Sequence, residues 1–493
     1  MKKIISLISL LLVLAMLAAG CAKTPEENTG DTTVDTADNG LLYDDNGYLK
    51  DGIPEEIDYD GALIKIKGWK DTEASRDFNE DGSKGDYIAS KTYSRNRKVE
   101  DRLNVELEFD LTHNGNNAAR YEYIQVVENA LRTDIKYDLI ACYSMNAANF
   151  ASDGFLTDLM DQNALDTEKP WWPQLMVENS TINNKLYFAS GSISTTSTMQ
   201  SMVLALNLNL MHSMGYNDPR DLVIDDQWTM NTFFEMCTDT YVDLNHETDG
   251  KDSGDRFGLV MFDSVMGDAF LTSNGLKYLS TDDSGKIVIA PEFKGEKIHA
   301  LAETLIQKFK SDDFWYNGKD TGNSPIFIEE RALFMGTTFF ALVNVKKDIS
   351  FEYGYLPFPK ADAAQENYYT CVGYPFTMWC IPLQCENHER AAYVMECLAS
   401  EGYRQVQPEV YQEVKYRSGS DALNAEMFDI IIGSTVYDIG RIFHNEFEWK
   451  DSPVGIFRSR LYKYDSSDWY SVLAGKQNAM ESVIAGINSS FGF

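Results

Sequence analysis

Ala62-Leu-Ile-Lys-Ile-Lys-Gly-Trp69 alternates apolar and polar side chains, as a β-strand does, and ends at a glycine and a tryptophan that we expect to be exposed. A helical pattern follows over 87–103, and a second alternating strand covers 104–110. The helical pattern returns over 120–132, before a short apolar strand at 137–142. Strand, helix, strand, helix, strand is the order of βαβ units, so the sequence predicts an α/β protein built on an open sheet.

The rest of the chain continues to alternate between strands and helices. Residues 202–207 read as a strand, Thr229 is a good N-cap for the helix that follows it, and 296–310 has the period of an amphipathic helix. Residues 331–340 should run through a strand into a turn at Gly336. Two more extended segments are expected, an edge strand at 351–360 and a buried strand at 372–382, and the remainder reads as mainly helical.

The N-terminus has the pattern of an export signal. The basic start Met1-Lys2-Lys3 precedes the apolar run Ile4–Ala19, which is short for a transmembrane helix. Its end, Leu17-Ala-Ala-Gly-Cys21, resembles a bacterial lipobox, although Ala18 stands where leucine is common. The resemblance implies a lipid on Cys21 and a place on the extracytoplasmic face of the bacterial cell membrane. Residues 1–21 would then be a lipoprotein signal peptide that ends at the lipobox cysteine. The alternative is an ordinary secretory signal with a chance cysteine.

Composition and charge exclude several classes of function. Residues 22–55 are polar and acidic and predict a disordered tether ahead of the folded part. The chain has 43 basic and 76 acidic residues, a net charge of −33, so phosphate backbones would repel it and nucleic-acid binding is excluded. The six cysteines after Cys21 fit no zinc-site spacing, and sequence alone leaves open whether they are thiols or form one or two disulfides.

Motifs of common enzymes are missing from the sequence. It has no Gly-x-Ser-x-Gly, no His-Glu-x-x-His and no phosphate-binding glycine loop, and the six histidines show no ligand spacing. One segment fits the first half of a calcium loop, with Asp77, Asn79 and Asp81 at ligand positions, but Ile88 replaces the glutamate expected at the twelfth. Calcium is therefore only a weak candidate, and a solvated acidic turn is the alternative. No other cofactor is expected.

Seven short motifs, in order along the chain, resemble the extracellular solute-binding proteins of bacterial ABC importers, in their carbohydrate-binding branch. They are Tyr137-Asp-Leu-Ile, Gly154-Phe-Leu-Thr-Asp-Leu, Asn184-Lys-Leu-Tyr, Met202-Val-Leu-Ala-Leu-Asn, Trp228-Thr, Glu330-Arg-Ala-Leu-Phe-Met-Gly and Tyr353-Gly-Tyr-Leu-Pro-Phe-Pro. The resemblance implies a two-lobe periplasmic-binding-protein-like fold of type II, with interleaved lobes joined by hinge strands near 200–208 and 371–382. Lobe 1 would hold 56–200 and about 376–425, and lobe 2 would hold 205–370 and about 426–493.

Ligands of open α/β sheets bind beyond the carboxyl ends of the strands, which selects the candidate contacts. Trp69 could stack on a sugar face or merely cover a helix, and Gln200 could both donate to and accept from hydroxyl groups. The related turn after Gly336 often carries a tryptophan, for which Thr338 or Phe339 would substitute here. The full candidate set is Trp69, Asp71, Tyr143, Asn146, Gln200, Thr337, Thr338, Phe339, Gly373 and Tyr374.

Together these observations predict a monomeric, non-enzymatic receptor that binds a carbohydrate, an oligosaccharide by the family resemblance, and delivers it to the transmembrane subunits of an ABC permease. Two other classes stay open at this point. A secreted glycan-processing enzyme would need two carboxyl groups facing each other at glycosidase spacing. A surface adhesion or sensor lipoprotein would need no permease.

Overall fold

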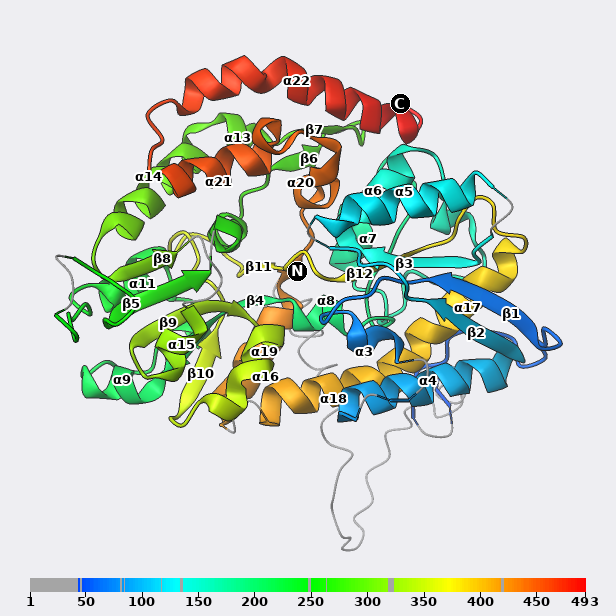
Figure 1. Cartoon of the computed structure of the whole chain (residues 1–493), viewed down its shortest axis with the longest axis horizontal. Coiled ribbons are helices and arrows are strands. Elements are labelled where there is room, and N and C mark those ends of the chain that lie inside the picture. The colour runs from blue at the N-terminus through cyan, green and yellow to red at the C-terminus, as the bar shows by residue number, and fades with distance from the viewer. Residues whose placement is uncertain are drawn as a thin grey trace, which may run out of the picture. The chain divides into compact units, whose positions relative to one another are not determined.

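Two mixed β-sheets form the framework of the chain from Asp51 onward, as the computed structural model in Figure 1 shows. Contacts divide the protein into two units, Met1–Lys50 and Asp51–Phe493. The structure describes residues 43–44, 47–79, 82–83, 85–116, 118–133, 136–246, 250–262, 264–317, 323–417 and 421–493. The predicted signal, Cys21 and most of the predicted tether therefore lie outside the described residues.

The first sheet, which we call the lobe 1 sheet, has the strand order β12-β3-β1-β2. Its strands are β1 (Ala62–Lys67), β2 (Val105–Asp110), β3 (Leu139–Tyr143) and β12 (Thr377–Cys380). Strand β1 runs parallel to β2 and β3, and β12 pairs antiparallel with β3. The three predicted N-terminal strands are confirmed, and a strand from far along the chain completes their sheet.

The second sheet, the lobe 2 sheet, has the order β10-β4-β9-β5-β8. Its strands are β4 (Met202–Asn207), β5 (Phe257–Phe262), β8 (Phe314–Asn317), β9 (Ala332–Thr338) and β10 (Tyr353–Leu356). Strand β5 is parallel to β8 and β9, whereas β4 is antiparallel to both of its neighbours. Two small sheets pair β11 (Thr370–Cys371) with β13 (Thr435–Val436), and β6 (Leu279–Thr281) with β7 (Ile287–Ile289).

Helices cover both faces of the lobe 1 sheet in Figure 1, with α5 and α6 above it and α4 and α17 below. The helices as far as β4 are α3 (Ser75–Phe78), α4 (Tyr87–Leu103), α5 (Ala119–Leu131), α6 (Ser144–Ser152), α7 (Gln174–Ser180) and α8 (Thr196–Met199). Those from β4 to β10 are α9 (Leu208–Ser213), α10 (Pro219–Ile224), α11 (Met230–Cys237), α12 (Gly267–Ser273), α13 (Pro291–Lys294), α14 (Glu296–Lys310), α15 (Asn323–Ile328) and α16 (Phe339–Val345). The C-terminal helices are α17 (His388–Glu401), α18 (Gln407–Tyr411), α19 (Ala422–Gly433), α20 (Ile439–Ile442), the 3-10 turn η6 (Phe443–Glu446), α21 (Pro453–Lys463) and α22 (Trp469–Ser490).

Local sequence explains where several of these helices begin. The Thr229 side chain accepts from the backbone N–H of Thr232, whose hydroxyl accepts from the Thr229 N–H in return, so the predicted N-cap of α11 is confirmed as a capping box. The Asp86 carboxylate caps α4 by accepting from Ala89 N at 2.9 Å, and Asn104 ends that helix with a φ of 48°. Helix α14 spans the predicted residues 296–310.

Three sequence expectations are wrong in detail. Trp69 is 1% exposed rather than on the surface. Gly336 lies inside β9, not in a turn. A Cβ there would come within 2.7 Å of the Met261 side chain on the neighbouring strand, so the close approach favours glycine at this position. The folded part also begins before residue 56, since the buried Asp51 carboxylate accepts hydrogen bonds from Arg102 at 2.6 Å and Ser400 at 2.7 Å.

The six described cysteines are all buried free thiols, which decides the alternative that sequence left open. In the ranges that the structure describes, no helix has the length and apolar character needed to cross a membrane.

Candidate functional site

Adjacent backbone segments carry the chain from one sheet to the other. Gly373 N donates to the carbonyl of Gln200 at 2.7 Å, and Ser201 forms an antiparallel bridge with Val372. Strand β11 lies beside β13, so a third segment, near Thr435, joins these two. The predicted hinge positions Gln200 and Gly373 are thus in direct contact, at the junction of the two sheets.

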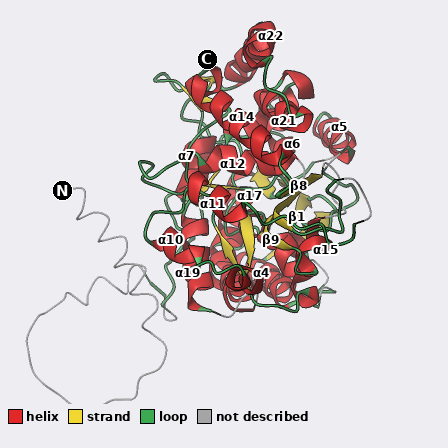
Figure 2. Ribbon diagram, turned by 90° about the vertical axis from the view of Figure 1, so that its left-hand side faces the viewer, coloured by secondary structure: helices red, strands yellow, loops and turns green. Residues whose placement is uncertain are grey.

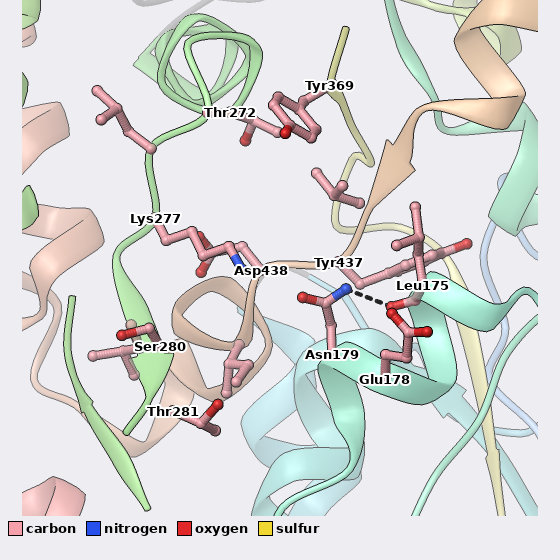
Figure 3. Close-up of a pocket in the computed structure, with 15 residues that line it drawn as sticks. Leu175, Glu178, Asn179, Thr272, Lys277, Ser280, Thr281, Tyr369, Tyr437 and Asp438 are labelled. Carbon is pink, nitrogen blue, oxygen red and sulfur yellow. Dashed lines mark hydrogen bonds between the residues drawn. The ribbon is translucent and has the colours of Figure 1, made fainter. Parts of the chain in front are cut away.

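A cavity of about 300 Å³ lies between α7 and β6, which fall in the predicted lobe 1 and lobe 2 respectively, and Figure 3 shows its lining. Leu175, Glu178 and Asn179 of α7 form one wall, and Lys277 with Ser280 and Thr281 of β6 lies opposite. The connecting segments contribute Tyr369, Val436, Tyr437, Asp438 and Ile439. Since the lining comes from separate elements, any relative motion of α7 and β6 would change the size of the cavity.

The cavity combines aromatic rings with polar groups. Tyr437 is buried and packs edge-on against Phe376, with ring centroids 5.7 Å apart. The Asn179 amide donates to the Leu175 carbonyl at 2.5 Å, which fixes its position on the wall. The Asp438 carboxylate accepts from Gly440 N at 2.6 Å and from Tyr278 N at 3.1 Å. Apolar walls with a few positioned polar groups are typical of small-molecule sites.

A second group of side chains gathers where the lobe 1 strands end. Trp69 follows β1 and packs edge-on against Tyr143, the last residue of β3, at a centroid distance of 5.4 Å. Its indole N–H donates to the Thr377 hydroxyl at 3.0 Å, at the start of β12. The Ser144 hydroxyl donates to the Tyr374 carbonyl at 2.7 Å. Burial raises the pKa of Tyr143 and of Tyr374, so both phenols stay protonated at neutral pH.

Two predicted contacts in this region hold buried polar atoms that lack partners. The Asn146 amide donates to the Gly115 carbonyl at 3.0 Å, but its oxygen finds no hydrogen bond among the described residues. The same is true of the Gln200 side-chain nitrogen. Buried polar groups are nearly always hydrogen-bonded, so such atoms at a lobe junction favour a bound water or ligand as their partner.

A buried ionic cluster that was not predicted from the sequence adjoins Tyr374. The Asp268 carboxylate, at the start of α12, accepts from Arg441 Nε at 2.8 Å and from Arg458 Nε at 2.9 Å. The two guanidinium groups lie 4.2 and 5.1 Å from the centroid of the Tyr374 ring. Both arginines hold the pKa of Asp268 below its usual value, against the effect of burial, so the cluster carries two positive charges and one negative charge.

His444, in η6, borders the same cluster and is neutral. Burial, reinforced by the nearby Arg458 charge, lowers its pKa to about 3. Its ring lies 6.4 Å from that of Tyr374 and 4.9 Å from that of Trp449. A neutral ring can pack against aromatic neighbours without adding charge to the cluster.

Comparison with solved structures identifies the fold. No family model matches the chain, and no curated protein matches it. A cyclo/maltodextrin-binding protein complexed with maltotetraose superposes with a TM-score of 0.57 at 11% identity, over 86% of this chain and 98% of that one. UgpB from Mycobacterium tuberculosis, in complex with glycerophosphocholine, gives 0.55 at 12% identity, over 85% and 98%. M. tuberculosis UspC gives 0.54 at 15%, over 87% and 100%. The chain shares the fold of these three proteins, and the predicted two-lobe α/β fold is confirmed.

Within this solute-binding fold the predicted contacts do not form one surface. Trp69 and Asp71 border a separate hollow of about 570 Å³ beyond β1, and none of the ten candidates lines the cavity of Figure 3. Thr337 lies in the buried part of β9. The Thr338 hydroxyl caps α16 by accepting a hydrogen bond from Ala341 N at 3.2 Å. Phe339 is fully buried against Tyr355, at 5.0 Å, and has no open face for a ligand.

The weak calcium candidates have other roles in the described part of this fold. The buried Asp77 carboxylate accepts from the hydroxyls of Thr195 and Thr196, both at 2.6 Å, and the Asn79 amide donates to the Ala89 carbonyl at 2.6 Å. Asp81 lies outside the described residues. No group of three or more His, Cys, Asp or Glu in the described ranges could hold a metal ion. The calcium assignment stays a prediction.

We expect the free energy of unfolding to fall as pH rises from 5 to 8. Burial raises the pKa of Glu396 to about 8, of Glu446 to about 7 and of Asp438 to about 6. In the folded state these three carboxyl groups keep protons that they lose near pH 4–4.5 in the unfolded chain. Their stabilising contribution to the free energy of unfolding is therefore complete below that pH and is lost by about pH 8. Urea denaturation at both pH values measures the change, which should exceed about 2 kcal/mol.

Glu446→Gln provides the control for this pH dependence. The Asn149 amide donates to Glu446 Oε1, which a glutamine oxygen can replace, and the variant has no carboxyl group to titrate. The pH dependence of stability should become shallower in the variant. Equal pH dependence in both proteins would contradict the assignment of Glu446 as a titrating group.

Proposed function

We propose that the protein is the binding component of an ABC importer and takes a carbohydrate, specifically a short oligosaccharide. The observation that carries the proposal is the cavity between α7 and β6, whose walls come from both lobes and from the segments that join them. A hinge motion of the lobes would open and close such a site around a ligand. Its volume of about 300 Å³ is at the low end of the range for small-molecule sites, which favours a short ligand over a long chain.

The chemistry of the lining supports a sugar. Tyr369 and Tyr437 offer rings on which a pyranose can stack, and Asn179, Ser280 and Thr281 can exchange hydrogen bonds with hydroxyl groups. Of the three similar structures, the one with the highest TM-score is a sugar-binding protein in complex with a maltooligosaccharide. The ligand of that complex, maltotetraose, is therefore a rational first ligand to test for binding.

Binding without chemistry is the mechanism that we propose. The ligand enters between the lobes, the lobes close, and the closed form docks on permease subunits. Glycoside hydrolysis would instead need two opposed carboxyl groups, one of them able to give up a proton. Glu178 and Asp438 are the carboxyl groups of the cavity lining, and both oxygens of Asp438 accept hydrogen bonds from backbone N–H groups, which suits a structural role.

The proposed location is the outer face of the cell membrane. The apolar run before Leu17-Ala-Ala-Gly-Cys21 and the polar segment after it support a lipid on Cys21 that keeps the receptor near its permease. The strongly acidic chain would gain little from direct contact with anionic lipids, so attachment would depend on that lipid.

Maltotriose and maltotetraose should raise the melting temperature of the tag-free protein, within a panel that also contains cello- and xylo-oligosaccharides and peptides. A ligand at 100 times its Kd stabilises the folded state by about 2.7 kcal/mol. Leu175→Trp places a large ring at the cavity wall and should abolish the shift while the protein stays folded.

Leu383→Trp is the matched control, because Leu383 is 54% exposed and lies outside the cavity. It should keep the full shift. A panel without any response would contradict the proposed function. An undiminished response in Leu175→Trp would keep the function but place the ligand elsewhere.

A further inference from the structure

Helix α22 lies along the edge of the molecule and reaches elements of both lobes. Figures 1 and 2 show it as the outermost helix, and it contacts both β7 and α6. The last residues of the chain, Asn488–Phe493, end between the β6–β7 hairpin and the loop that follows α7. The cavity described above has α7 and β6 on opposite sides, so the chain end lies between segments that adjoin its two walls.

The contacts of α22 on the lobe 2 side are spread along the helix. The Asn488 side chain accepts from Ile287 N and donates to Ile287 O, both at 2.8 Å, so it pairs with β7 as a neighbouring strand would. At the other end of the helix, the fully buried Trp469 packs 5.6 Å from Phe293. Lys294 also forms an ion pair with Glu481 at 3.5 Å. These contacts, spread along the whole of α22, fix the helix to the β6–β7 hairpin and to α13.

The C-terminus makes fewer contacts on the lobe 1 side. The Phe491 ring is fully buried and lies 4.9 Å from the ring of Tyr187. The Asn183 amide donates to the Phe491 carbonyl at 2.8 Å. Tyr187 and Asn183 belong to the segment that links α7 to the hinge. The Phe491 ring also lies 6.0 Å from the Phe443 ring, and α22 contacts α6, so the ring and the hydrogen bond are the specific contacts of the C-terminus with the 183–187 segment.

We propose that Asn488–Phe493 is a latch that holds the cleft closed by inserting Phe491 into lobe 1. Opening the lobes separates β7 from the Asn183–Tyr187 segment, and the C-terminus must then leave one of them. It leaves lobe 1, because its contacts there, which are the Phe491 ring, one carbonyl and the contact of α22 with α6, are fewer than those with lobe 2. The latch shifts the equilibrium between open and closed forms toward the closed one, before any ligand is bound. This inference rests on the hinge motion of the proposed function, but not on the identity of the ligand.

Phe491→Ala in the ligand-free protein tests the latch. We expect a larger radius of gyration by small-angle X-ray scattering than in the wild type, and hydrogen exchange in 182–188 faster by at least about fivefold. Asn183→Gly removes the hydrogen bond from lobe 1 and suits the φ of 51° at that position, so it should shift both measurements in the same direction.

Phe493→Ala is the matched control, because the Phe493 ring lies under the Lys286 ammonium at 5.4 Å, on the β6–β7 side. It should leave the radius and the exchange in 182–188 unchanged. The latch is wrong if Phe491→Ala and Asn183→Gly both fold and both keep the wild-type radius and exchange. It is also wrong if Phe493→Ala opens the protein equally. Because these measurements use no ligand, a failed saccharide panel would contradict the proposed function and leave this test intact.

Discussion

Asp268→Asn should lower the free energy of unfolding by about 3–5 kcal/mol, the usual cost of removing one partner from a buried ion pair. The Asp268 side chain is fully buried and neutralises one of two buried guanidinium groups, those of Arg441 and Arg458. Asparagine keeps the shape but turns one acceptor oxygen into a donor that faces an arginine. Tyr278, whose hydroxyl donates to Asp268 at 2.7 Å, loses its charged acceptor as well.

Urea denaturation at pH 7 measures this loss, with Asp283→Asn as the control. Asp283 is exposed beside β6, so the same change there should stay within about 0.5 kcal/mol. A loss below about 1 kcal/mol for Asp268→Asn would mean that Tyr374 and the backbone carbonyl of Val372 suffice to hold both arginines.

Asp77→Ala should lower the free energy of unfolding by at least about 3 kcal/mol. Several buried hydrogen-bond donors would lose their acceptor, and each loss costs about 1–3 kcal/mol. The carboxylate accepts from Thr195 N at 2.7 Å, from the Thr195 and Thr196 hydroxyls at 2.6 Å, and from the Thr377 hydroxyl at 2.7 Å. It therefore ties the Ser/Thr-rich segment before β4 to the start of β12. Both segments lead into the junction of the lobes.

The control for Asp77→Ala is Asp101→Ala, on the exposed face of α4. We expect that variant to unfold at nearly the wild-type urea midpoint. Added calcium supplies a separate readout: stabilisation of the wild type that Asp77→Ala abolishes would show that Asp77 binds the ion, and would contradict its assignment to the threonines alone.

Periodicity predicted most of the framework. The alternation in 62–67 and 105–110 corresponds to β1 and β2, where buried and exposed residues alternate over most of the strand. The short apolar strand predicted at 137–142 corresponds to β3, which is buried throughout. The capping signal at Thr229 was equally local. Such features depend on neighbours within a few residues, which is why a single sequence contains them.

The site depends on contacts that no short window of sequence contains. Asp268 meets Arg441 and Arg458 at separations of 173 and 190 residues, and the motif around each is ordinary. Trp69 was expected on the surface because it follows a strand, but its edge packs on Tyr143 and its N–H needs Thr377. Nothing in the sequence marked the α7 wall of the cavity as a binding surface, because Leu175 and Asn179 are ordinary residues for a half-buried face of a helix.

The pairing of β12 with β3 has a consequence for how the chain is made. A ribosome delivers β1, β2 and β3 early, but their sheet is complete only after Thr377–Cys380 has been synthesised. Until then the Tyr143 side of β3 is an open edge, and lobe 1 cannot fold as an independent N-terminal domain. Pairings between strands so distant in sequence also form slowly. The lobe 2 sheet uses only strands between Met202 and Leu356, so all of its strands are synthesised before the lobe 1 sheet can be completed.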